Sequence, residues 1–212
     1  MSTRHFLSTV TRLALGAVVA ITSASCGGEM LRTGRAPVYL VIDSISARNG
    51  AKDGAEEANL HSDVLTIVEV TINGQTVRVP TVFDDGGSAT FRIEAKNQDV
   101  ATTALNAVTL TRYHVNFRRT DGRNTPGVDV PYGFDGGLST TISPGQGATV
   151  AFMLVRHQNK IEPPLRNMIN FGGLGFLSVI AEVTFYGRDQ NGNEVMATGN
   201  LDVQFGDFGD ES

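Results

Sequence analysis

Residues 177–205, LSVIAEVTFYGRDQNGNEVMATGNLDVQF, decide the fold of this chain. Apolar and polar side chains alternate on both sides of residues 190–192, which is typical of two half-buried β-strands. Opposed residues of an antiparallel pair share a face, so Phe185 must oppose another inward-facing residue. A three-residue loop over 190–192, with Gly192 in a left-handed conformation, pairs Phe185 with Ala197. The same register places Val183 opposite Gly199 and Ala181 opposite Leu201.

A second hairpin is predicted over residues 64–79, where Asn73-Gly74 lies between alternating β-branched residues. Asn-Gly favours a two-residue turn that needs positive φ at both positions. That turn pairs Val70 with Val77 and Glu69 with Arg78. Because these two pairs lie on opposite sides, we expect one apolar face and one face with a cross-strand ion pair. Val68 and Val79 extend the apolar face.

The remaining strand patterns occupy residues 38–47, 89–96, 108–119, 138–142 and 148–155. Residues 148–155 are apolar on both faces, which favours a central strand covered on both sides. Residues 163–169 are the one stretch suited to a short helix, with proline at its start. About eight strands with turns between them and almost no helical periodicity predict an all-β antiparallel β-sandwich.

The first 25 residues have the pattern of a signal peptide, with Arg4 and Arg12 before a nine-residue apolar stretch over 13–21. Small residues follow, and then comes Cys26, the only cysteine of the chain. We therefore divide the chain into four parts. These are a signal peptide over 1–25, a tether with a lipidated Cys26 over 26–36, the sandwich over 37–206 and a disordered acidic tail over 207–212.

Composition narrows the function classes. The 212 residues contain 17 Lys+Arg and 22 Asp+Glu. Without the signal peptide, 15 basic residues remain against 22 acidic ones, a formal charge of −7. A nucleic-acid-binding protein is expected to carry net charge of the opposite sign, so no nucleic-acid partner is expected. One cysteine excludes structural disulfides within the chain.

Three resemblances accompany these patterns. The segment up to Cys26-Gly27-Gly28 resembles the lipobox of bacterial lipoproteins, in which the cysteine carries a diacylglyceryl group, although Ser23 stands where that family usually has Leu. The strand order and the FYGRDQNGNEV segment resemble the immunoglobulin-like sandwiches of bacterial cell-surface proteins. The chain also resembles uncharacterised predicted lipoproteins with RYHVNFRRTDGRNTPGVDVPYGFDGG and GRDQNGNEV segments.

These resemblances imply an immunoglobulin-like fold and a lipid-anchored place in the bacterial cell envelope, at the outer membrane or periplasmic face. The alternative is a secreted protein, since Ser23-Ala24-Ser25 also suits an ordinary signal peptidase.

Sequence motifs typical of catalytic, nucleotide-binding or metal-binding sites are scarce. HExxH, GxSxG, Walker A and GxGxxG patterns do not occur. Asp189-x-Asn191-x-Asn193 resembles the start of a calcium loop, but Glu194 stands where that loop needs glycine, and a hairpin turn explains the segment better. His61, His114 and His157 are predicted to be solvated or locally hydrogen-bonded, and the alternative is a metal site that forms only if loops bring them together. Asp84-Asp85-Gly86-Gly87 is predicted to form a turn, and the alternative is Ca²⁺ binding. No cofactor, metal or catalytic residue is therefore expected.

Three long loops, over 48–63, 119–137 and 157–175, are the best candidates for a working surface. Alternating strand directions place all three at the end opposite the N-terminus. Their candidate partner-binding residues are Arg119, Asp121, Arg123, Asn124, Asp129, Tyr132, His157, Lys160 and Arg166.

The expected function is that of a non-catalytic, lipid-anchored envelope protein, attached to the membrane through its anchor. Its sandwich would present these loops to an unknown protein or glycan, or serve a structural role. A secreted carbohydrate-binding module is one alternative, although few aromatic rings lie in the long loops. A periplasmic hydrolase using Asp121 or Asp129 is the other, although no spaced pair of acids supports it.

Overall fold

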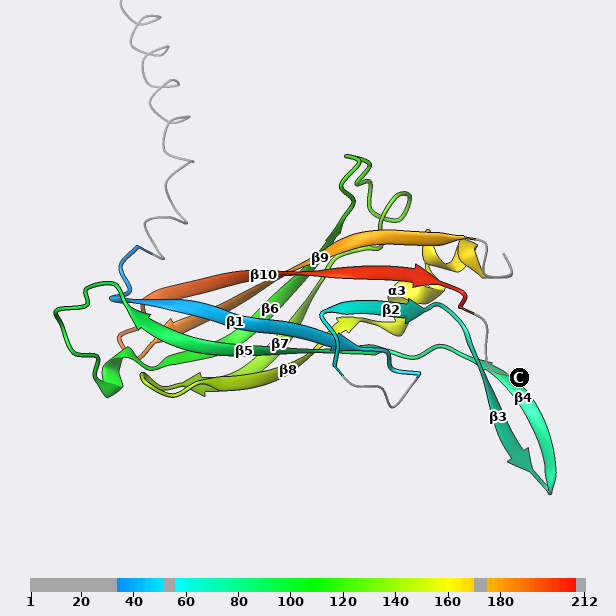
Figure 1. Ribbon diagram of the computed structural model, residues 1–212, viewed down its shortest axis with the longest axis horizontal. Coiled ribbons are helices and arrows are strands. Elements are labelled where there is room, and N and C mark those ends of the chain that lie inside the picture. Colours follow the sequence, from blue (N-terminus) through cyan, green and yellow to red (C-terminus); the bar gives the residue numbers. More distant parts are fainter. Residues whose placement is uncertain (1–33, 52–55, 170–174, 209–212) are drawn as a thin grey trace, which may run out of the picture.

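The computed structural model describes residues 34–51, 56–169 and 175–208. The signal peptide, Cys26, most of the tether and the end of the acidic tail lie outside the described residues. The described chain is all-β (Figure 1). Its strands are β1 (Val38–Arg48), β2 (Asn59–Asp63), β3 (Thr66–Ile72), β4 (Gln75–Thr81), β5 (Asp85–Ala95), β6 (Val108–Arg118), β7 (Phe134–Ile142), β8 (Ala148–Val155), β9 (Phe176–Asp189) and β10 (Glu194–Gly206).

The strands form three sheets, of which two pack face to face. The order is β1-β5-β8 in one sheet and β2-β10-β9-β6-β7 in the other, and β3 pairs only with β4. All neighbours are antiparallel except β2 and β10, which run parallel. Strand β1 lies along β10, and β7 along β8, so the layers also meet at both margins. The predicted all-β class is confirmed, and the layering is consistent with a β-sandwich.

The β9–β10 register is as predicted. Phe185 opposes Ala197, and Gly192 has a φ of 83°. The buried Asp189 carboxylate accepts hydrogen bonds from the backbone N–H groups of Asn191 and Asn193, at 2.9 and 2.8 Å, so it closes a turn. The other two predicted pairs, Val183 with Gly199 and Ala181 with Leu201, are also present.

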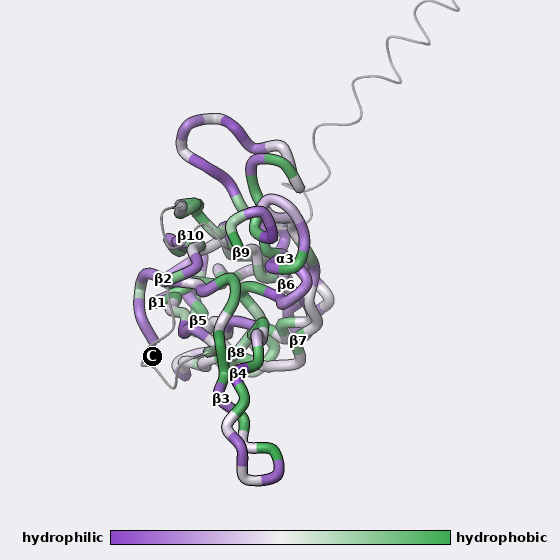
Figure 2. The backbone as a smooth tube through the Cα atoms, turned by 90° about the vertical axis from the view of Figure 1, so that its right-hand side faces the viewer, coloured by the Kyte–Doolittle hydropathy of each residue, from purple (hydrophilic) through white to green (hydrophobic). Residues whose placement is uncertain are grey.

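The β3–β4 hairpin has the predicted register but not the predicted setting. Val70 opposes Val77 and Glu69 opposes Arg78, and Asn73 and Gly74 both have positive φ. The hairpin was expected to contribute strands to the sandwich, yet it belongs to neither packed sheet. Figures 1 and 2 show it projecting from the body. The turn fixes pairing within the hairpin, but nothing in that pattern decides whether its apolar face is covered.

Strand β8 and the helices also differ from expectation. Strand β8 was predicted to be central, but it lies at the edge of its sheet with Ala151 exposed. Apolar residues at the surface are common, so two apolar faces do not prove double coverage. A 3₁₀ helix, η2 (Leu165–Met168), falls within the predicted helical stretch, and η1 (Ala104–Asn106) precedes β6. A five-residue helix, α3 (His157–Ile161), lies outside it.

The core between the layers is aromatic. The Phe185 ring lies 4.8 Å from that of Phe91 and 5.2 Å from that of Phe152, both edge to face. Tyr113 lies beside Phe152, and its hydroxyl accepts a hydrogen bond from the backbone N–H of Met153 at 3.1 Å. These contacts join β5 and β8 to β6 and β9, which holds the two sheets together.

Described residues just outside both predicted boundaries contact the sandwich. Ala36 is buried, one residue before the predicted start. Phe208, in the predicted tail, donates its backbone N–H to Asp63 at 3.3 Å and packs its ring against His61. Among the described residues, none of the helices is long and apolar enough to cross a membrane.

Candidate functional site

The described parts of the predicted long loops meet at one end of the sandwich, although residues 59–63 of the first predicted loop form β2. This distal end consists of the described segments that follow β1, β6 and β8, the β3–β4 hairpin, the first residues of β9 and the described residues after β10. It lies away from the start of β1 (Figure 1). The Asn159 side chain donates to the Tyr132 carbonyl at 2.8 Å, which joins the segments after β8 and β6. The Gly50 N–H donates to the Asp85 carboxylate at 2.9 Å, which joins the segment after β1 to β5.

The segment after β6 is organised by a carboxylate between two guanidinium groups. Arg119 Nε lies 3.1 Å from Asp121 Oδ1, and Arg123 Nη2 lies 2.9 Å from Asp121 Oδ2. The Arg119 side chain, followed by the Arg123 backbone N–H, holds the pKa of Asp121 well below its usual range. Asn124 accepts the Arg119 N–H at 2.6 Å, and Asp129 accepts the Thr125 N–H at 3.2 Å. These predicted residues therefore shape the loop.

A shallow hollow of about 360 Å³ lies beside this cluster. Arg119, Arg123 and Asp129 form its polar side, and Val128, Met168 and Phe176 are among its apolar lining residues. Phe176 is 72% exposed and Val128 is 67% exposed, so large apolar side chains are open to solvent here. Tyr132 and Arg166 are also exposed at this end, but neither lines the hollow.

Another surface, which the loop argument missed, is the apolar side of the β3–β4 hairpin. Val70, Val77 and Val79 are between 37% and 43% exposed, and Ile72 near the turn is 53% exposed. Figure 2 shows apolar and polar stretches on this isolated ribbon. Alternating valines around Asn73-Gly74 were the available signal, but the same signal also describes a hairpin inside a core.

Two neighbouring aspartates at the start of β5 have different roles. Partial burial raises the pKa of Asp84, but hydrogen bonds from the backbone and ring of His157, with the charges of His157 and Lys160, outweigh it, so this pKa is lowered. The His157 ring nitrogen lies 3.0 Å from the Asp84 carboxylate. Asp85 and Lys160 form a fully buried contact. Lys160, predicted at a partner-binding surface, is therefore enclosed, while His157 remains exposed.

The three histidines of the described residues occupy separate settings. His61 packs against Phe208, His114 lies 3.2 Å from Asp135, and His157 contacts Asp84. Within the described residues, no group of three His, Cys, Asp or Glu side chains is arranged to hold a metal ion.

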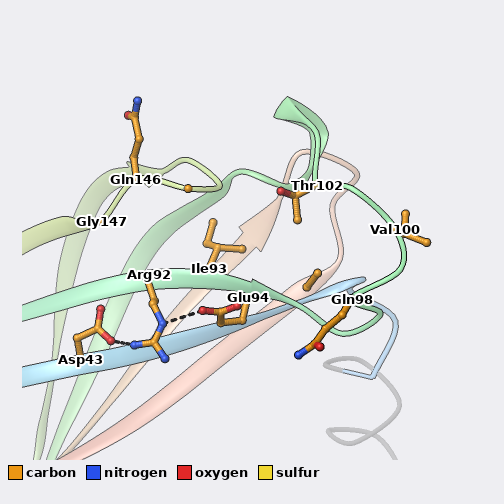
Figure 3. A pocket seen from close by; sticks show the side chains of 11 residues that line it. Asp43, Arg92, Ile93, Glu94, Gln98, Val100, Thr102, Gln146 and Gly147 are labelled. Carbon is orange, nitrogen blue, oxygen red and sulfur yellow. Dashed lines mark hydrogen bonds and ion pairs between the residues drawn. The ribbon is translucent and has the colours of Figure 1, made fainter.

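A larger depression lies near the other end of the molecule, over β1 and β5 (Figure 3). Its volume is about 600 Å³, and its lining includes Asp43, Arg92, Glu94 and Gln98. Arg92 pairs with both Asp43 and Glu94, and the Arg92–Glu94 distance is 2.9 Å. These charges compensate one another, so among the described residues the depression lacks the convergent unpaired charged groups typical of a catalytic pocket.

No family model matches this chain, and comparisons with curated proteins and with solved structures find nothing similar to it. The resemblance to bacterial lipoproteins and its functional implications therefore stay predictions.

Proposed function

We propose that this chain is a non-catalytic, lipid-anchored cell-envelope protein whose distal end binds a partner protein. One observation carries the proposal: nine of the thirteen exposed large apolar side chains of the described residues lie at the distal end. Exposed apolar groups concentrated in one region are typical of protein interaction surfaces. The nine are Val70, Ile72, Val77, Val79, Val128, Tyr132, Ile161, Phe176 and Phe208.

The chemistry of this surface favours a polypeptide over a glycan. Six of these nine side chains are aliphatic, whereas sugar recognition relies on aromatic rings. The β3–β4 hairpin also has two outer edges with no partner strand among the described residues. An extended segment of the partner, with apolar side chains at alternate positions, would pair with such an edge and cover the valines. Carbohydrate binding is the competing outcome of the test below.

The proposed fold within the sandwich class is immunoglobulin-like. The order β1-β5-β8 corresponds to strands A, B and E of that fold, and β10-β9-β6-β7 corresponds to G, F, C and C′. Under this correspondence, the β3–β4 hairpin is an insertion between the first and second strands of the ABE sheet. The insertion supplies a binding element without altering the core.

The proposed anchor places this hairpin outward. Ten residues lead from Cys26 to Ala36, the first buried residue described, and they span at most about 35 Å when extended. The start of β1 and the hairpin lie at opposite ends of the molecule (Figure 1). An acyl anchor at Cys26 would therefore keep the start of β1 near the membrane and direct the hairpin away from it.

Site-specific photo-crosslinking in intact cells tests the binding proposal. A photoreactive phenylalanine analogue at Val77 is expected to give a discrete adduct with one protein. The same analogue at Val100, exposed outside the distal end, is the matched control and should give none. The identified protein, once purified, should bind this chain directly and lose at least about tenfold in affinity with V70S/V77S. Equal adducts at both positions, or glycan-array binding that these substitutions abolish instead, would contradict the proposal.

Labelling with a fatty-acid analogue tests the anchor separately. The wild-type chain should incorporate the label and fractionate with membranes, and C26A should do neither. C26S is a useful second variant because it keeps the side chain small and polar while removing the thiol. Release of the unlabelled wild-type chain into the soluble fraction would refute the anchor and leave the binding surface untouched.

A further inference from the structure

The distal end contains a polar centre that the proposed function does not use. Asp85 begins β5, Lys160 lies in α3, and Ser62 lies in β2. All three residues are fully buried, with no solvent exposure. They come from segments far apart in the sequence, yet they meet beneath the loops of the distal end.

The atoms of this centre are in contact. Lys160 Nζ lies 2.9 Å from Asp85 Oδ2, and Ser62 Oγ donates a hydrogen bond to the same oxygen at 2.6 Å. The Gly50 N–H donates to Asp85 Oδ1 at 2.9 Å. The amine is close to the carboxylate but not aligned for a hydrogen bond, and Lys160 Nζ has no hydrogen-bond partner among the described residues.

Lys160 and Asp85 are both fully enclosed, so a reaction that removes both of their charges is favoured there. Transfer of one proton from the Lys160 ammonium to Asp85 Oδ2, across the 2.9 Å contact, leaves a neutral amine and a neutral carboxylic acid. The amine then has a free lone pair and is a nucleophile. The acid has an electrophilic carbon, and the fold holds both groups at reacting distance, which removes most of the entropy cost of bringing them together.

We infer that Lys160 and Asp85 condense within the folded chain into an amide that cross-links α3 to β5. The bond between Lys160 Nζ and Asp85 Cγ forms, and the bond between Cγ and Oδ2 breaks. Oδ2 leaves as water with two of the three ammonium protons, and the third stays on the amide nitrogen. The reactants carry one positive and one negative charge and the products carry none, so no oxidant or other co-reactant is needed.

The neighbours of Asp85 suit this reaction. The Gly50 N–H points at Oδ1, where negative charge develops as the amine attacks, so it can stabilise that oxygen. The Ser62 hydroxyl donates to Oδ2, the oxygen that departs, and can pass it a proton. Ser62 therefore acts on the reacting atoms, while Gly50 stabilises the charge on the oxygen that remains.

Mass spectrometry of the full-length wild-type chain decides the question. The folded, purified protein should be lighter than its sequence requires by the mass of one water molecule, after allowance for any processing at Cys26. Trypsin does not cut after an acylated lysine, so digestion should yield one branched peptide joining residues 79–92 to residues 157–166. Free peptides 157–160 and 161–166, with no missing water, would overturn the inference.

Variants separate the cross-link from the fold. K160R keeps the positive charge and cannot form the amide under these conditions, so it should retain the full mass and migrate more slowly on a denaturing gel than wild type. S62A keeps both reacting groups, and we expect the cross-link to form about 100-fold more slowly during refolding. The wild-type measurement stands even where a variant fails to fold. A branched peptide that persists in K160R would assign the bond to another residue and contradict the inference.

Discussion

The β3–β4 and β9–β10 hairpins are built by the same local rules and have different fates. Each has a short turn with a glycine at positive φ, and each pairs apolar residues across the strands. In β9–β10 the face that carries these apolar residues lies against the aromatic core, and Phe185 is fully buried. In β3–β4 the corresponding Val70 and Val77 remain exposed. Local pattern therefore determines pairing, whereas coverage depends on where the hairpin joins the rest of the chain.

The largest expected effect comes from opening the covered hairpin. F185A removes a ring that contacts Phe91 and Phe152, and it should cost about 3–5 kcal/mol of unfolding free energy because it leaves a cavity between the sheets. Chemical denaturation followed by far-ultraviolet circular dichroism measures this loss. A change below about 1 kcal/mol would mean that the two layers are not joined through this ring.

A matched pair of substitutions compares the two hairpins directly. V183T places a hydroxyl in the buried face of β9 and should cost about 1–3 kcal/mol, since that group loses water. V77T makes the same change on the exposed face of β4 and should stay within about 0.5 kcal/mol. Denaturation midpoints of both proteins provide the measurement. Equal destabilisation would show that the β3–β4 face is covered in solution, for example by a second copy.

An effect smaller than those of F185A and V183T concerns the turns. Gly74 and Gly192 have φ angles of 77° and 83°, and a Cβ at either would meet no atom within 4 Å. G74A and G192A should therefore each cost about 1 kcal/mol locally, through backbone strain alone. We expect only G192A to lower the global unfolding free energy, because β3 and β4 pair with neither packed sheet and should open independently of the core. Hydrogen exchange should show faster opening confined to β3 and β4 in G74A.

The features that could be predicted from the sequence are those that depend on residues close together in the chain. Period-two alternation located the strands, and the Gly192 and Asn73-Gly74 turns gave both registers. It failed for β8, whose apolar outer face lies at a sheet edge, and for α3, whose five residues have too little periodicity to detect. These features depend on tertiary contacts that no local pattern specifies.

In the candidate site, too, some features follow from local sequence and others depend on tertiary contacts. The convergence of the three loops followed from alternating strand directions. The burial of Lys160 did not, because a lysine in a polar loop is normally solvated and only the folded chain reveals Asp85 beside it. The exposed valines of β3–β4 were visible in the sequence, but their exposure was not.

The antiparallel pairing of β1 with β5 also has a mechanical consequence. Val38, where β1 begins, pairs with Ala95, while Arg48 pairs with Gly86 near the start of β5, the strand that follows the hairpin. A pull on the hairpin against a fixed N-terminus would drag these strands past each other lengthwise. Their hydrogen bonds would then bear the load together instead of opening one after another, so the domain should resist tension along this axis far better than across it.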